Sequence, residues 1–79
     1  MMDNKLLMEY ARKGLMAEIR ELEKTVEKGR LHLKAIDTGV MPKTPLSRSE
    51  IEAVIETAKA KIEALSREEL ELRYAQALE

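Results

Sequence analysis

His32 is the only histidine in the 79-residue chain, so it is the first residue to test for metal binding or proton transfer. Carboxylate metal sites inside helical bundles pair a histidine with a glutamate three residues before it. The nearest preceding acidic residue, Glu27, lies five residues before His32, which is the wrong spacing. His32 also flanks the apolar stripe described below. We therefore interpret it as a surface residue and expect no metal site.

The remaining residues that could carry catalysis have simpler structural explanations. Ser47, Ser49 and Ser66 fit helix capping, and none is spaced with a histidine as a nucleophile requires. The three glycines are too far apart in the sequence to cradle a phosphate. The chain has no cysteine, which excludes thiolate chemistry and cysteine-bound zinc. We expect no enzymatic activity and no cofactor.

Charge is distributed unevenly although the formal net charge is only -1. Within residues 28–48, five basic residues oppose one acidic residue, Asp37, which leaves +4, whereas residues 49–79 have four basic and eight acidic residues, which leaves -4. The basic residues of the first segment are Lys28, Arg30, Lys34, Lys43 and Arg48. They either complement the helix dipoles or form a basic tip that contacts nucleic acid or an acidic protein. No aromatic residue is interleaved there to stack on bases.

Apolar residues at alternating steps of four and three predict a first helix over about residues 3–38. Such a stripe faces one partner helix, and we call it the seam. Leu7, Met8 and Ala11 extend it, with Arg12 beside them. The central seam residues are Leu15, Ile19, Leu22, Val26, Gly29, Leu33 and Ile36. Gly14 and Gly29 each weaken a helix by about 1 kcal/mol relative to alanine, so a kink is an alternative to a continuous helix.

Residues 39–46 predict a stiff turn, because Gly39 suits a left-handed helix cap and Pro42 and Pro45 stop a helix. Ser47 and Glu50 fit a capping box that begins a second helix over 47–78. Its seam consists of Ile51, Ile55, Ala58, Ile62, Leu65 and Leu72. Glu69 interrupts this seam, and we expect it opposite Arg12 or a lysine, where it selects the register. A second capping box over 66–69 allows the alternative of three helices.

Two helices joined by so short a turn pack antiparallel, so the sequence predicts an all-α helical hairpin that forms one domain over residues 1–79. If facing residues have numbers that sum to about 84, Gly29 faces Ile55 and Val26 faces Ala58. A single hairpin of this length gains little net stability. We therefore expect a homodimer in the form of a four-helix bundle.

More apolar residues gather at the open end of the hairpin, opposite the turn, than one seam can bury. They point to an interface with a partner or, equally, to a wider core within the chain. The predicted interface residues are Leu7, Tyr10, Leu15, Met16, Leu70, Tyr74 and Leu78.

The function that fits these features best is a small protein-interaction module, an adaptor or inhibitor that docks its helices on a partner protein. Phage and mobile-element genomes encode many small regulators of this kind, so a phage origin is one interpretation. A nucleic-acid-associated factor that uses the basic tip and a structural part of a larger assembly are the alternatives. Residues 1–10 contain Asp3 and Glu9 and no long apolar run, so we expect neither a signal peptide nor a membrane span. We expect a cytoplasmic protein.

Overall fold

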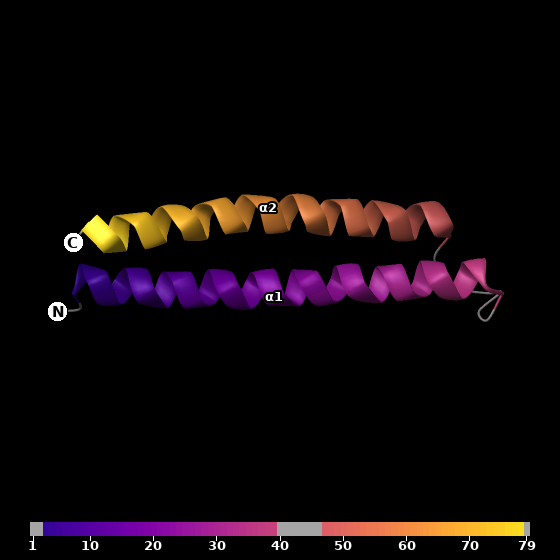
Figure 1. Cartoon of the computed structure of the whole chain (residues 1–79), viewed down its shortest axis with the longest axis horizontal. Helices are drawn as coiled ribbons and strands as arrows, with labels where there is room; N and C mark the ends of the chain where they lie inside the picture. Colours follow the sequence, from indigo (N-terminus) through magenta and orange to yellow (C-terminus); the bar gives the residue numbers. More distant parts are fainter. Residues whose placement is uncertain (1–2, 40–46, 79) are drawn as a thin grey trace.

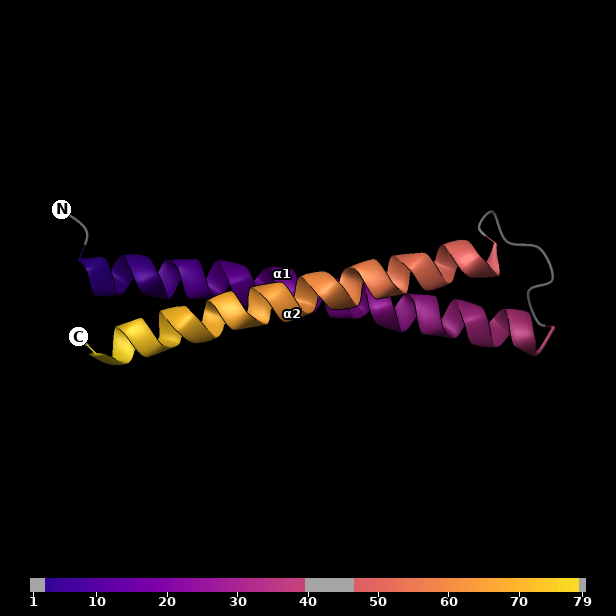
Figure 2. The same cartoon turned by 90° about the horizontal axis from the view of Figure 1, so that it is seen from above.

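Two long helices make up the part of the chain that the structure describes, which is residues 3–39 and 47–78 of a computed structural model. Helix α1 spans Asn4–Asp37 and helix α2 spans Arg48–Leu78. They lie side by side and antiparallel (Figure 1), and they cross near their middles when viewed from above (Figure 2). The hairpin measures 56 × 18 × 15 Å. The predicted all-α hairpin is confirmed, with each described boundary within one residue of the prediction.

The helix ends follow local capping chemistry. Asp3 precedes α1 and its carboxylate accepts a hydrogen bond from the Lys5 amide at 3.3 Å. At the other end, Gly39 has a φ of 76°, and its amide donates to the Ile36 carbonyl at 3.1 Å. This is the left-handed cap that the sequence predicts, in a conformation that disfavours side chains. The rest of the predicted turn, including Pro42 and Pro45, lies outside the described residues.

Helix α2 begins after Ser47, whose hydroxyl accepts from the Glu50 amide at 3.2 Å, as one half of the predicted capping box requires. The helix then continues without interruption to Leu78. The three-helix alternative is therefore wrong. The spacing of seam residues is unchanged on either side of Ser66, from Ile62 to Leu72, so an unbroken helix keeps its apolar side against α1. Helix α1 likewise runs through Gly14 and Gly29 as one element.

The buried core lies between the crossing point and the turn. It consists of Val26, Ile51, Ile55 and Ala58, with Leu22, Leu33, Ile36 and Ile62 packed against it. Gly29 is buried there, in close contact with α2. A Cβ atom at this position would lie only 2.6 Å from Cγ1 of Ile55. The missing side chain makes room for Ile55, which confirms the predicted pairing of Gly29 with Ile55.

Candidate functional site

The hairpin divides into two halves that differ in what they bury. We call residues 22–39 and 47–62 the turn half, and residues 3–21 and 63–78 the open half. The turn half contains every buried apolar side chain of the described residues, whereas the only buried residue of the open half is Glu69, which is 5% exposed. The seam residues Leu15, Leu65 and Leu72 of the open half are only half-buried.

Glu69 is held by two arginines. Its Oε1 atom accepts from Nε of Arg12 at 3.0 Å, and its Oε2 atom accepts from Nη2 of Arg73 at 2.7 Å. Arg12 also donates through Nη1 to Oε1 of Gln76 at 2.7 Å. The predicted position of Glu69 opposite Arg12 is therefore confirmed. Sequence reasoning missed Arg73 and Gln76, although Arg73 stands four residues after Glu69 and Gln76 continues the seam spacing.

These contacts decide the charge state of Glu69. Burial disfavours the carboxylate and raises its pKa, but the hydrogen bonds and positive charges of Arg73 and Arg12 outweigh burial and lower the pKa below the ordinary value of 4.5. Glu69 is therefore ionised at neutral pH. One carboxylate between two guanidinium groups leaves this cluster with a net positive charge, which suits alignment of the helices more than proton transfer.

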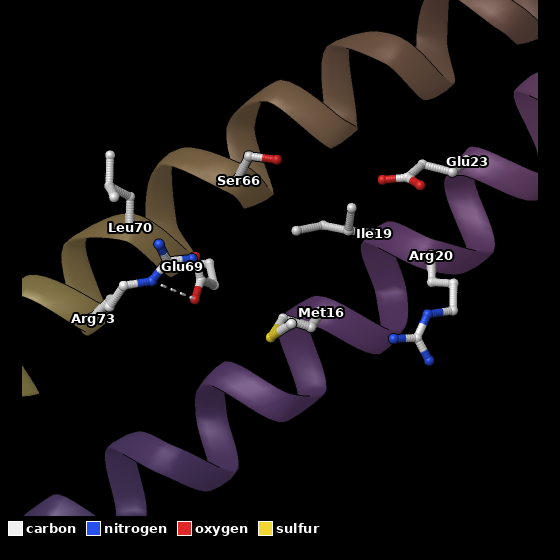
Figure 3. A pocket seen from close by; sticks show the side chains of 8 residues that line it. All are labelled: Met16, Ile19, Arg20, Glu23, Ser66, Glu69, Leu70 and Arg73. Carbon is white, nitrogen blue, oxygen red and sulfur yellow. Dashed lines mark hydrogen bonds and ion pairs between the residues drawn. The ribbon is translucent and has the colours of Figure 1, made fainter.

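A surface groove passes over this cluster on one side of the hairpin. Figure 3 shows Met16 and Ile19 of α1 and Glu69 of α2 facing the space between the two helices. Arg73 lies along α2 beside Glu69, and Leu70 points away from α1. A second groove adjoins it on the outer side of α2, where Leu70 and Arg73 lie beside Tyr74 and Ala77. The two grooves share Leu70 and Arg73, so they adjoin each other. The first is lined by both apolar and charged residues, whereas the second is mainly apolar.

The open half also contains most of the exposed large apolar side chains. Among the described residues, seven of the nine large apolar side chains that are exposed belong to the open half. They are Leu6, Leu7, Tyr10, Met16, Leu70, Tyr74 and Leu78. Six of the seven predicted interface residues are in this set. The seventh, Leu15, lies half-buried on the seam and packs within the hairpin instead.

The residues of the predicted basic tip differ in how they are paired and in which direction they point. Arg48 is bound on both sides, by the Asp37 carboxylate and by Glu52 at 3.1 Å, so its charge is largely compensated. Lys28, Arg30 and Lys34 are exposed on α1. Arg30 and Lys34 are four residues apart and share one side of α1, whereas Lys28 points away from it. Lys43 lies outside the described residues.

Among the other residues tested for chemistry, the Ser47 and Ser49 hydroxyls lie 3.2 Å apart at the start of α2. His32 and Glu27 are both exposed on α1, and Ser47 serves as a helix cap. Within residues 3–39 and 47–78, no three potential metal ligands come together, and no helix is long and apolar enough to cross a membrane.

No family model, curated protein or solved structure matches the chain.

Proposed function

We propose that this chain is a protein-interaction module, an adaptor or inhibitor, that binds its partner through the open half. The observation that carries the proposal is the opposite placement of buried and exposed apolar residues. The described core lies entirely in the turn half, and seven of the nine exposed large apolar side chains lie in the open half. Exposed apolar side chains that are concentrated in one part of a protein in this way are typical of binding sites.

The composition of the open half suits a protein partner. Tyr10 and Tyr74 combine a large apolar ring with a hydroxyl group, which stays compatible with water in the free protein and with burial in a complex. Met16 adapts its shape to a neighbouring surface. Arg73 lines both grooves, and arginine and tyrosine are both enriched where proteins bind each other. A helical groove of this kind accepts the apolar side of another helix.

The proposal is tested by placing a photo-reactive amino acid at Leu70 or at Leu31 of the full chain in its native cells. The two positions are 58% and 60% exposed but lie in opposite halves, so they are a matched pair. We expect a discrete protein adduct from position 70 and none from position 31. Equal labelling at the two positions, or no discrete adduct at position 70, would contradict the proposal.

The cellular setting belongs to the same proposal. The cysteine-free sequence is compatible with a reducing compartment, and we propose the cytoplasm. We also propose that this small helical module is a phage-derived regulator. The nucleic-acid alternative has weaker support, because Asp37 and Glu52 both engage Arg48 at the tip. Retention on a polyanion column should accordingly change little with Lys34→Glu.

A further inference from the structure

We propose that the partner of the open half is a second copy of this chain, and that the two hairpins overlap antiparallel through their open halves only. This inference rests on the proposed function of the open half as an interaction surface, and it names the occupant. In the dimer, α1 lies against the partner's α1 and α2 lies against the partner's α2. The two turn halves then project in opposite directions.

The hairpin exposes more surface than a compact protein of its mass, and the excess is large enough for such a contact. The chain exposes 6146 Å², whereas a compact folded monomer of 9.0 kDa exposes roughly 4,900 Å². The excess is therefore about 1,200 Å². A stable interface of standard size removes about 800 Å² from each partner. One additional interface accounts for most of the excess, so a dimer is sufficient.

One side of the open half provides the contact surface, which we call the dimer face. Met16 and Arg20 line the groove of Figure 3 from α1, and Ser66 and Leu70 line it from α2. Seven residues are close to two helical turns, so residues seven apart lie on the same side of a helix. Leu6 and Lys13 therefore share the side of Arg20, Glu9 shares that of Met16, and Ala77 shares that of Leu70.

The order of residues on the dimer face fits contact with itself. A two-fold interface places the same surface on both subunits, so the pattern must match its own reverse. On α1 the order is apolar, acidic, basic, apolar: Leu6, Glu9, Lys13 and Met16. Reversal around residue 11 sets Leu6 against the partner's Met16 and Glu9 against the partner's Lys13. Apolar residues then meet apolar ones, and each carboxylate meets an ammonium group.

The residues of the dimer face on α2 also match their own reverse. Leu70 and Ala77 are symmetric around the point between Arg73 and Tyr74, and reversal there sets Leu70 against the partner's Ala77. Contacts within the hairpin show that the centre of reversal on α1 and the centre of reversal on α2 lie at the same height along the hairpin. Arg12 binds both Glu69 and Gln76 and so lies opposite the midpoint between them, near residues 72 and 73. Residue 11 therefore lies opposite residues 73 and 74, and one two-fold axis serves both helices.

The turn half also has a groove, lined by Leu22, Thr25, Ala53, Val54, Thr57, Ala58 and Lys61. Of the large apolar residues there, however, only Leu31 and Val54 are exposed. This arrangement restricts the four-helix bundle expected from the sequence to a partial overlap of the open halves. Two hairpins of 56 Å that share about 25 Å give a particle about 90 Å long. A bundle aligned over its full length would stay near 56 Å.

The first test is sedimentation equilibrium of the full chain combined with small-angle X-ray scattering. We expect a concentration-dependent dimer with a maximum dimension near 90 Å. A chain that stays monomeric at about 1 mM, or a dimer near 56 Å long, would overturn the inference. A monomer that still gives an adduct with a different protein from position 70 would overturn the second copy as partner and leave the proposed function standing.

The second test uses charge reversal in two separate chains. Glu9→Lys places like charges opposite each other in its own dimer, and so does Lys13→Glu. Each variant alone should dimerise about tenfold more weakly than the unaltered chain. An equal mixture should recover the original affinity, because residue 9 of one chain then opposes a complementary residue 13 of the other.

The mixture separates contacts between chains from contacts within one. Glu9 and Lys13 also pair within one helix at 3.8 Å, and each variant loses that pair whether alone or mixed. Recovery on mixing therefore requires the contact between chains, and failure to recover would overturn the proposed register.

Leu70→Glu should abolish the dimer at the same concentration, with unchanged helicity by circular dichroism, whereas the matched Leu31→Glu should not. A dimer that survives Leu70→Glu would also contradict the proposal.

Discussion

The turn half and the open half of this hairpin contain seams of the same spacing but use them differently. In the turn half, small residues at Gly29 and Ala58 meet Ile55 and Val26, and the apolar side chains are buried within one chain. In the open half, a buried carboxylate between two arginines stands where an apolar residue would continue the core. The large seam residues Leu15, Leu65 and Leu72 are only half-buried, and seven other large apolar side chains of this half remain exposed.

This difference separates two tasks that are usually combined in a small core. Burial in the turn half stabilises the hairpin, while the Arg12–Glu69 pair in the open half aligns the helices with a smaller contribution to stability. A shifted register would leave Glu69 without its partners, which is unfavourable for a buried charge. The apolar residues of the open half are therefore free for association, on a surface whose geometry is already fixed.

The largest expected effect comes from the core of the turn half. Ile55→Ala should lower the free energy of unfolding by about 2–3 kcal/mol, because it removes a buried side chain that the neighbours cannot fully replace. Leu72→Ala in the open half removes a half-buried side chain and should have about half that effect. Urea denaturation at a protein concentration where the chain is monomeric measures both. Equal losses would remove the distinction between the halves.

An intermediate effect is expected at Glu69, and it depends on pH. The folded-state pKa of Glu69 lies below the ordinary value of 4.5, so its ionisation favours the folded chain above that pH. This contribution is lost as the pH falls through the lowered folded-state pKa. Glu69→Gln should therefore lower stability at neutral pH and flatten its decline below pH 4.5. An unchanged acid profile would show that the arginines do not stabilise the carboxylate.

The two glycines of α1 give the smallest effects, and these should have opposite signs. Nothing lies within 4 Å of a Cβ atom at Gly14, so Gly14→Ala should raise the free energy of unfolding by about 0.5–1 kcal/mol. At Gly29 the new Cβ would approach two atoms of Ile55 to 2.6 and 2.9 Å. Overpacking should outweigh the gain in helix propensity, for a net loss of about 1 kcal/mol. Thermal unfolding of both variants compares them directly, and stabilisation by both would contradict the close approach at Gly29.

Local signals in the sequence were sufficient for the fold. The seam spacing, the cap at Gly39 and the Ser47 hydroxyl each depend on neighbouring residues, so they could be interpreted before the structure was known. The facing of Glu69 and Arg12 also followed from the register, because a charge on a seam needs a partner.

The division between the halves could not be predicted in the same way. Leu15, Leu65 and Leu72 continue the spacing of the buried residues Val26, Ile51, Ile55 and Ala58, yet they are only half-buried. Their burial depends on how closely the two helices approach, which the residues across the seam decide together. Arg73 was missed for a related reason, since its role depends on the position of the Glu69 side chain between the helices.

The most direct test of the contrast is residue-resolved hydrogen exchange of the full chain at several protein concentrations. At labelling times short enough for local opening to dominate exchange, we expect the amides of residues 22–36 and 51–62 to exchange at rates that do not depend on concentration. The amides of residues 8–18 and 66–77 should exchange more slowly as concentration rises and the open halves associate. Protection that is uniform along both helices at every concentration, or that rises in the turn half instead, would contradict the account.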